Sequence, residues 1–262
     1  MKISIIGAGA MGGAIAEGWI KAQGGQREGL CVADASRDAL QRLADRGIHT
    51  TTDNTLAARE GNVVMVVVKP WITERVLREI KDTLDYGHQL LVVVAAGVSS
   101  EHISSWLAKE GQPTIPFFLA IPNIGISQLE SMTFIVPIGA SKEQTDCVAA
   151  LFGKMGRVLV TEERLLAAGT TLASCGIAYA LRYIRAAVEG GVELGFKAGE
   201  AQAIVAQTMK GAVSLLQATG LHPEQLIDQV TTPGGVTIKG LNEMEHAGFT
   251  SAVIRGLKAG AK

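Results

Sequence analysis

The residues best suited to bind a ligand or take part in a reaction lie near the end of the chain, in the segment Val230–Leu241. Within it, Thr231-Thr-Pro-Gly-Gly-Val-Thr237 lies between an apolar segment and a helical pattern. Pro233 and the two glycines after it are expected to end one helix and start another, which leaves unpaired backbone N–H groups beside Thr237. Such a helix start attracts small anions such as a carboxylate. Considered alone, the segment is more often a plain interhelical turn.

A second group lies at the other end of the chain. Gly7, Gly9 and Gly12 form G-x-G-x-x-G directly after a short apolar strand and before an apolar helical pattern. In a dinucleotide-binding turn the first glycine permits the tight turn, the second lets the backbone approach a pyrophosphate, and the third lets helix and strand pack closely. Asp34 ends the next apolar strand, 34 − 12 = 22 residues after Gly12, where a ribose-binding acid is expected. We therefore favour a dinucleotide site over a simple glycine-rich turn.

Three further strands end in proline or glycine, at Lys69-Pro70, at Ala95-Ala-Gly-Val98 and at Pro122-Asn123. Ligands of doubly wound sheets bind outside the carboxyl ends of the strands, so these ends are expected to meet in one crevice on the nicotinamide side. Asn54 either caps a helix or reaches the adenosine. The expected cofactor-binding residues are Gly7, Ala8, Gly9, Ala10, Met11, Gly12, Asp34, Ser36, Arg37, Asn54, Val68, Lys69, Pro70, Ala95, Ala96, Gly97 and Asn123.

The choice between NADH and NADPH stays open. Asp34 would accept the ribose 2′-OH of NADH and repel the 2′-phosphate of NADPH, whereas Ser36 and Arg37 could bind that phosphate. We expect both cofactors to work, with Asp34 favouring NADH.

These groups require a scaffold, and the first half of the chain predicts an α/β domain with a Rossmann-type doubly wound sheet, since short apolar strands alternate with amphipathic helices. The run Val63–Val68 lacks alternation, as expected of a strand covered on both faces. The expected strands are residues 3–6, 30–33, 63–68, 90–95, 114–121 and 133–136. The expected helices between them are residues 11–22, 37–46, 72–84, 100–109 and 142–155.

After about residue 160 the pattern becomes helical and rich in Ala, Leu and Gly. We expect a dinucleotide-binding domain over residues 1–160 and an all-helical dimerisation and substrate-binding domain over 161–262. Residues 165–196 and 200–216 read as long helices that are apolar around most of their circumference. Such helices must be covered on all sides, so we expect partner subunits to cover them in a homodimer or larger homo-oligomer.

Composition limits the partners. The net charge of −1, without a basic run, argues against nucleic acid as a partner.

The cysteines and histidines bear on redox compartment and metal binding. Three scattered cysteines fit a reducing cytoplasm without a disulfide framework. The five histidines have no ligand spacing, so no metal is expected. The chain starts directly in a strand, which gives no sign of a signal peptide. The uncharged sequence of residues 165–181 predicts a buried helix and not a membrane span, so no membrane partner is expected.

No Ser-His-Asp, Cys-His or paired-carboxylate arrangement stands out. Hydride transfer needs no protein nucleophile, because the cofactor carries that chemistry.

From end to end the chain resembles pyrroline-5-carboxylate reductases. The most specific similarity is Asp228-x-Val-Thr-Thr-Pro-Gly-Gly-x-Thr-Ile238, followed by Leu241 and Glu245. Further similarity lies in the Gly7–Gly12 turn, Val67-Val-Lys-Pro70, Ala95-Ala-Gly97, Pro122-Asn123, Gly176 and Ala178-Tyr179. The resemblance implies a Rossmann domain, a helical dimerisation domain and NAD(P)H-dependent reduction of the cyclic imine 1-pyrroline-5-carboxylate to L-proline, the last step of proline biosynthesis.

The resemblance also implies residue roles. Thr237 would face the ring nitrogen as the catalytic residue, and Thr232, Gly235 and Val236 would surround the substrate carboxylate, with Gly234 in the same segment. Asn54 would contact the adenosine end of the cofactor. The nicotinamide end would contact Lys69, Pro70, Ala95, Ala96 and Asn123.

Two segments depart from the family pattern. Leu119-Ala-Ile-Pro-Asn-Ile-Gly125 lacks an Arg, a Thr and a second Pro that relatives often have. The family's Ser-Gly-Ser-Gly-Pro-Ala-Tyr appears as Ala173-Ser-Cys-Gly-Ile-Ala-Tyr179. These changes leave open a reductase of the same fold acting on another imine or a carbonyl acid. A second alternative, of a different class, is a non-catalytic nucleotide-sensing protein.

Overall fold

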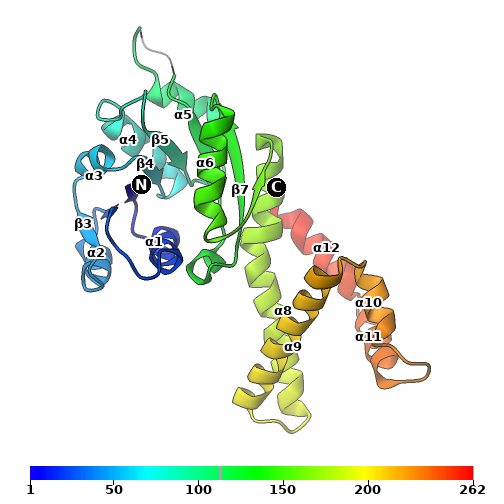
Figure 1. The fold of residues 1–262 in the computed structure, drawn as a ribbon. Helices are drawn as coiled ribbons and strands as arrows, with labels where there is room; N and C mark the ends of the chain where they lie inside the picture. Colours follow the sequence, from blue (N-terminus) through cyan, green and yellow to red (C-terminus); the bar gives the residue numbers. More distant parts are fainter. Residues whose placement is uncertain (112–113, 262) are drawn as a thin grey trace. The chain divides into compact units, whose positions relative to one another are not determined.

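The structure is a computed structural model that describes residues 1–111 and 114–261. The chain forms two compact units, Met1–Ser174 and Cys175–Lys262, and Figure 1 traces both. A helical run begins at the 3₁₀ turn Glu163–Leu165, ahead of the second unit. The division after residue 160 that we expect from the sequence stays a prediction.

The first unit contains a mostly parallel sheet with the strand order β3-β2-β1-β4-β5-β6-β7-β8. Neighbouring strands are parallel except β6 and β7, which pair antiparallel. The strands are β1 (Ile3–Ile6), β2 (Leu30–Ala33), β3 (His49–Thr51), β4 (Val63–Val66), β5 (Leu90–Val93), β6 (Phe117–Ile121), β7 (Ser131–Ile138) and β8 (Gly156–Val160). This confirms the doubly wound architecture. The chain order reverses between β1 and β4, and ligands of such sheets bind beside that point.

Helices cover both faces of this sheet (Figure 1). The helices α1 (Ala10–Ala22), α2 (Arg37–Ala44) and α6 (Lys142–Gly153) pack on one face; α3 (Asn54–Glu60), α4 (Pro70–Ile80) and α5 (Ser100–Leu107) pack on the other. Alternate residues of β4 enter the two cores, since Met65 lies in the first and Val64 in the second, both fully buried. Double coverage explains the unbroken apolar run of this strand.

The ranges expected from the sequence leave out the short strand β3, the strand β8, the helix α3 and the 3₁₀ helix Ile124–Gln128. The cap of α3 is Asp53, whose Oδ1 accepts hydrogen bonds from the N–H groups of Thr55 at 2.8 Å and Leu56 at 3.1 Å. The interpretation of Asn54 as the cap is therefore wrong. Asn54 is the first residue of α3, and its Nδ2 donates to Oε2 of Glu79 at 3.0 Å.

The helix expected over residues 165–196 is continuous but irregular. It contains α7 (Leu166–Gly169), a π-helical turn (Thr170–Cys175) and α8 (Gly176–Glu193). Turns of this wide type are frequent at functional sites. The second unit continues with α9 (Ala198–Thr219), α10 (Pro223–Gln229), α11 (Val236–His246) and α12 (Phe249–Gly260).

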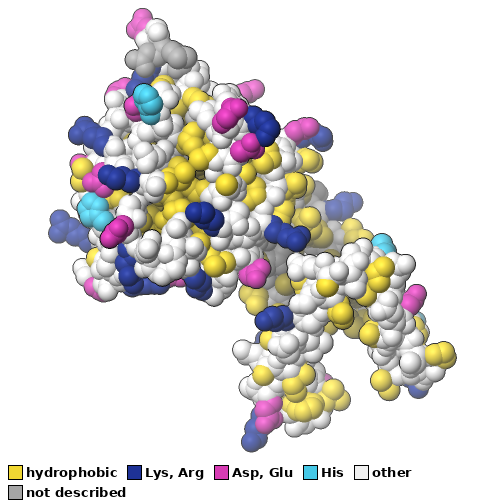
Figure 2. All heavy atoms as spheres, viewed as in Figure 1, with side chains coloured by type: hydrophobic (Ala, Val, Ile, Leu, Met, Phe, Trp, Pro, Cys, Tyr) yellow, Lys and Arg dark blue, Asp and Glu magenta, His cyan; other side chains and the backbone are white. Residues whose placement is uncertain are grey.

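The second unit buries little of its own apolar surface. Among its described residues, only Val188 and Ala201 are buried hydrophobic residues, whereas Leu181 is 58% and Leu215 55% exposed. Figure 2 shows hydrophobic side chains on the surface of these helices. The run Glu163–Glu193 is by length and composition alone apolar enough to cross a membrane. Helices that pack against another subunit carry the same kind of surface, because they too must be covered.

Candidate active site

The glycine-rich turn between β1 and α1 has the geometry of a cradle for a phosphate group. Gly7 has a φ of +114°, and a Cβ on it would lie 2.2 Å from the carbonyl oxygen of Val67. A Cβ on Gly12 would lie 1.8 Å from the carbonyl oxygen of Gly7, so only glycine allows α1 to pack this closely. Around Gly9, by contrast, nothing lies within 4 Å of such a Cβ. The open side of Gly9 and the unpaired N–H groups at the start of α1 fit a pyrophosphate.

Asp34 lies beside this turn. Its Oδ2 accepts a hydrogen bond from the N–H of Ala8 at 2.6 Å, and its Oδ1 accepts one from the N–H of Ser36 at 2.7 Å. Each carboxylate oxygen can accept a further bond. Asp34 thus fixes the turn and retains the capacity to accept a ribose hydroxyl.

A cavity of about 470 Å³ runs along the carboxyl ends of the central strands. Ten residues that the sequence assigns to the cofactor line it: Gly7, Gly9, Ala10, Met11, Asp34, Val68, Lys69, Pro70, Ala95 and Ala96. The convergence of the β1, β4 and β5 ends follows from their parallel pairing. The surface of the cavity is mainly apolar, which suits a nicotinamide ring.

The other expected cofactor residues do not line this cavity. Ala8 lines a neighbouring cavity with Gly9 and Ala10. Gly12 packs under the turn, and Gly97 follows β5 with a φ of +79°. Ser36 caps α2 through a hydrogen bond from the N–H of Ala39 to its Oγ at 3.3 Å, Arg37 begins that helix, and Asn54 begins α3. Their contacts with a cofactor stay predictions.

Asn123 is 4% exposed and holds the wall of the crevice. Its Oδ1 accepts a hydrogen bond from the N–H of Gly125 at 3.0 Å, and its Nδ2 donates to the carbonyl oxygen of Ala173 at 3.4 Å. The side chain thereby connects the turn after β6 with the π-helical turn. Its contact with the nicotinamide also stays a prediction.

The cavity has lining residues that sequence reasoning did not assign: Val67, Ile72, Val94, Ile121, Pro122, Ile124, Thr170 and Ser174. Ser174 Oγ donates to the carbonyl oxygen of Pro122 at 3.0 Å. Several of these residues fall in the two segments that depart from the family pattern. The departure from the family pattern was the sequence signal that could have identified them, because it marks a part of the cavity wall whose composition differs from that of relatives.

In the second unit, the segment before α11 has the expected form. α10 ends at Gln229, α11 begins at Val236, and Gly235 is its N-cap residue. This confirms that the Pro-Gly-Gly sequence lies between two helices and directly precedes the second, whereas α10 already ends before Pro233. Gly234 has a φ of +70°, a left-handed conformation that favours glycine.

Gly235 is constrained by space and not by its backbone angle, since its φ is −68°. Its N–H donates to the carbonyl oxygen of Thr232 at 2.9 Å, and a Cβ on it would lie 2.4 Å from Thr232 Oγ1. Thr232 and Gly235 therefore pack directly against each other.

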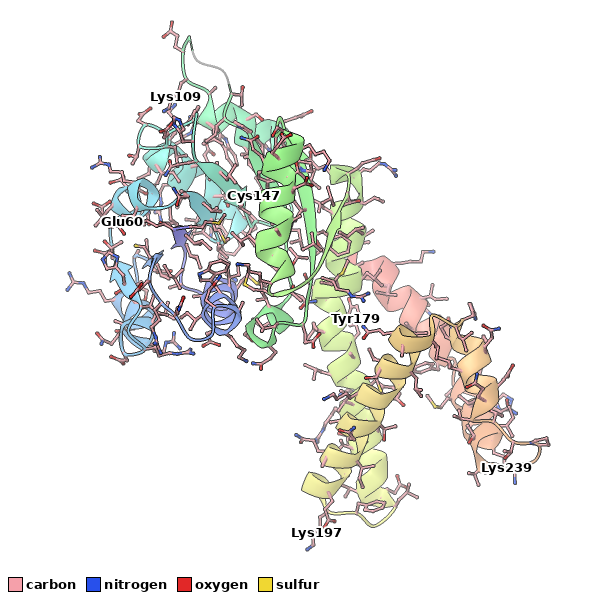
Figure 3. The ribbon with its side chains drawn as sticks, viewed as in Figure 1. Glu60, Lys109, Cys147, Tyr179, Lys197 and Lys239 are labelled. Atoms are coloured by element: carbon pink, nitrogen blue, oxygen red, sulfur yellow. The ribbon has the colours of Figure 1, made fainter. Side chains whose placement is uncertain are left out.

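The start of α11 favours an anion. No acidic residue lies in its first turn, so no carboxylate of the helix competes for the free N–H groups. Lys239, labelled in Figure 3, follows Thr237 by two positions and adds positive charge. Val236 is 84% exposed and Thr237 is partly buried. The predicted substrate residues Thr232, Gly234, Gly235, Val236 and Thr237 thus form one short structure, and their binding role stays a prediction.

Two family models match the chain. One, described as pyrroline-5-carboxylate reductase dimerisation, matches residues 163–262. The other, described as NADP oxidoreductase, coenzyme F420-dependent, matches residues 2–97. The second covers the glycine-rich turn and most of the cavity-lining strand ends, and the first covers the helical part.

Relatives match over nearly the whole chain. Pyrroline-5-carboxylate reductase 1 of Dictyostelium discoideum is 36% identical over 97% of this chain, which spans about half (48%) of that relative. Pyrroline-5-carboxylate reductase 2 of the same organism is 33% identical over 100% of this chain and 91% of its own length. A solved pyrroline-5-carboxylate reductase structure from Coxiella burnetii is similar with a TM-score of 0.87 and 28% identity, covering 99% of this chain and 96% of that one.

Proposed function

The chain belongs to the pyrroline-5-carboxylate reductase family, and on that premise we propose that it catalyses the NAD(P)H-dependent reduction of 1-pyrroline-5-carboxylate to L-proline. This reaction is the last step of proline biosynthesis. The observation that carries the proposal is the start of α11, where a Pro-Gly-Gly turn presents free N–H groups next to Thr237. A protein that only sensed a nucleotide would not need such a carboxylate site.

The crevice of the first unit fits a dinucleotide. The open side of Gly9 and the start of α1 would hold the pyrophosphate, Asp34 the ribose, and the ends of β4 and β5 the nicotinamide. A bound reduced nicotinamide supplies the hydride, so the protein needs no nucleophile of its own. Both NADH and NADPH remain candidates, because Asp34 favours the first while Ser36 and Arg37 lie beside it for the second.

The segment Thr232–Thr237 would bind the substrate. Free backbone N–H groups at the start of α11 would donate hydrogen bonds to the substrate carboxylate, with attraction from the helix dipole and Lys239. The hydroxyl of Thr237 accepts a hydrogen bond from an iminium N–H and donates one to the product amine, since a hydroxyl does both. In this account the protein acts by orientation and charge complementarity, and orientation alone can supply roughly 7–11 kcal/mol of the barrier.

We further propose that the helical part forms a homodimer or a larger homo-oligomer. The dimerisation model over residues 163–262 supports this, as does the exposed apolar surface of α8 to α12. Cys31, Cys147 and Cys175 are all free thiols, which supports a reducing compartment such as the cytoplasm.

The proposal is tested by a panel of substrates assayed with each cofactor. We expect consumption of NADH and NADPH with 1-pyrroline-5-carboxylate and formation of L-proline. Faster turnover of a larger cyclic imine or of a carbonyl acid would instead favour the related-reductase alternative. That outcome has a structural basis, because Ile121, Pro122, Ile124 and Ser174 line the cavity within the departing segments. Cofactor binding without turnover of any substrate in the panel would favour a sensor.

A further inference from the structure

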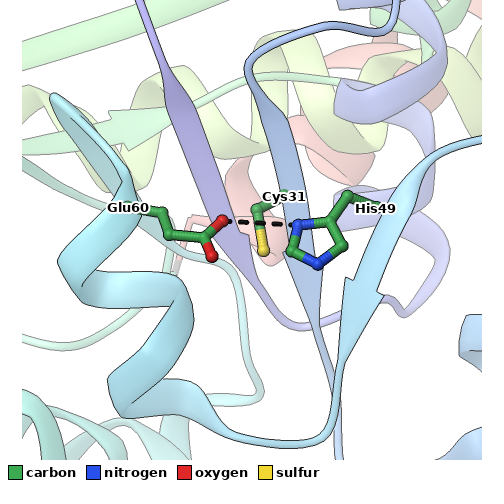
Figure 4. A group of neighbouring side chains, drawn as sticks. All are labelled: Cys31, His49 and Glu60. Carbon is green, nitrogen blue, oxygen red and sulfur yellow. Dashed lines mark ion pairs between the residues drawn. The ribbon is translucent and has the colours of Figure 1, made fainter.

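The structure brings together three side chains that sequence reasoning left separate: Cys31, His49 and Glu60. Their ligand atoms, the cysteine sulfur, a histidine ring nitrogen and a carboxylate oxygen, all lie within 4.8 Å of one another. Figure 4 shows the three side chains converging from β2, β3 and the end of α3. None of the three has a part in the proposed reaction.

The parallel sheet determines this arrangement. Cys31 pairs in register with His49 on β3 and with Ser4 on β1, so the three side chains form a row on one face of the sheet. Glu60 is the last residue of α3, which covers the same face. The row lies near the amino ends of the strands, whereas Asp34 follows the carboxyl end of β2. The cluster is therefore distinct from the cofactor crevice.

A cavity of about 360 Å³ opens onto the cluster, and Ser4, Cys31, His49 and Glu60 all line it. Ser4 is fully buried, and its Oγ has no hydrogen-bond partner in the described structure. Buried hydroxyl groups are normally paired, so an orphaned one needs an explanation. A hydroxyl here can donate to a metal-bound thiolate or accept from a metal-bound water.

We propose that Cys31, His49 and Glu60 bind a Zn²⁺ ion, with a water molecule in the fourth position. A thiolate, an imidazole and a carboxylate are the ligand types that zinc uses, and sulfur disfavours Mg²⁺ and Ca²⁺. Zinc holds sulfur at about 2.3 Å and imidazole nitrogen at about 2.0 Å, so the observed spacing needs only small movements of the side chains. His49 and Glu60 can make them, since their side chains are 58% and 37% exposed.

Charge is balanced in the bound state. The Cys31 thiol loses its proton to solvent on binding, and the thiolate and the Glu60 carboxylate together neutralise the two charges of the ion. Lys2, Arg27 and Glu28 also line the cavity and are the other charged groups at the site. The ion would fasten the end of α3 to β2 and β3, which is a structural role.

The competing interpretation is an ordinary core thiol beside a surface ion pair. His49 Nδ1 lies 3.3 Å from Glu60 Oε2. Burial first, and then the charge and hydrogen bond of Glu60, raise the pKa of Cys31 to about 12. In that interpretation the Cys31 thiol stays protonated, and the missing hydrogen-bond partner of the buried Ser4 hydroxyl has no explanation.

Metal titration of the full-length protein separates the two interpretations. After treatment with a chelator and its removal, the protein is titrated with Co²⁺ and then with Zn²⁺ as competitor. We expect one Co²⁺ per chain, with a thiolate-to-cobalt charge-transfer band in the near ultraviolet that Zn²⁺ abolishes. Cys31→Ala should lose the band. His49→Ala and Glu60→Gln should each weaken affinity by about tenfold or more.

Cys147→Ala is the matched control, because Cys147 lies on α6 (Figure 3) and lines a different cavity. It should keep the band and the affinity of the parent protein. If Cys31→Ala does not fold, the His49 and Glu60 variants still test the proposal. Both substitutions are at partly exposed side chains, and both leave the Cys31 thiol in place. The proposal is overturned if the parent protein gives no charge-transfer band, if Cys147→Ala abolishes the band, or if both the His49 and Glu60 variants bind as tightly as the parent.

Discussion

Asp34 Oδ2 accepts a hydrogen bond from the backbone N–H of Ala8, with 2.6 Å between the two atoms. This bond joins the end of β2 to the glycine-rich turn after β1. Asp34 shapes the turn, and we propose that it also offers a carboxylate to the ribose. A substitution there should alter both the selectivity for cofactor and the affinity for either one.

For Asp34→Ser we expect the ratio of kcat/KM for NADPH to that for NADH to rise by about tenfold, equivalent to ~1.4 kcal/mol, because the charge that repels a 2′-phosphate is gone. Affinity for both cofactors should fall, because the turn loses its bond to Oδ2. Asp146→Ser, at an exposed position of α6, is the control and should leave the ratio unchanged. An unchanged ratio in Asp34→Ser would mean that Asp34 does not face the ribose.

Thr237→Ala tests the catalytic assignment. It removes one hydroxyl and leaves the N–H groups at the start of α11 in place. We expect kcat/KM for the imine to fall by one to a few powers of ten, each about 1.4 kcal/mol, with little change in cofactor affinity. Thr250→Ala, on α12, is the control. Full activity in Thr237→Ala would refute the role of this helix start, and a loss confined to cofactor affinity would mean that the two ligands were assigned to the wrong segments.

Alanine substitutions at the two glycines before α11 should impair the protein for different physical reasons. Gly235→Ala would push a methyl group against Thr232 Oγ1, so we expect a higher KM for the imine through a displaced Thr232. Gly234→Ala has free space but a φ of +70°, so its cost is backbone strain of about 1–2 kcal/mol. Steady-state kinetics and thermal unfolding of both variants separate these effects. Parent-like values in both would show that the turn tolerates a side chain.

Self-association should depend on the apolar groove in the second unit that is lined by Val253, Met244 and Phe249. We expect the parent protein to sediment as a dimer or larger species at micromolar concentration. Val253→Asp should shift it toward monomer, because a charge would be buried in the interface. Ser251→Asp, on the same helix but outside the groove, should not. A monodisperse monomer of the parent protein would contradict the proposed assembly.

The sequence predicted the fold well where the pattern was local and strong. The apolar strands, the glycine-rich turn and the Pro-Gly-Gly start of α11 each have a signal within a few residues. β3 was missed because it has only three residues, the first of them exposed His49. β8 was missed because its residues are mostly exposed and it starts with a glycine. Asp53, and not Asn54, caps α3, a choice between two neighbouring side chains that composition does not decide.

The cavity was predicted only in part, for a physical reason. Strand-end residues such as Lys69 and Ala95 follow from the rule that ligands bind at the carboxyl edge of the sheet. Thr170 and Ser174 come from a π-helical turn far along the chain, and no local pattern places that turn against β6. Likewise, Cys31, His49 and Glu60 have no ligand spacing in the sequence. They meet only through strand pairing and the cover of α3.

The most direct test of the central claim is the fate of the transferred hydride. The protein is incubated with 1-pyrroline-5-carboxylate and NADH or NADPH deuterated at the transferable position of the nicotinamide, and the product is analysed by mass spectrometry and NMR. We predict L-proline that carries one deuterium on the ring carbon next to nitrogen, opposite the carboxylate-bearing carbon. Proline without deuterium, or no proline from either cofactor, would contradict the account.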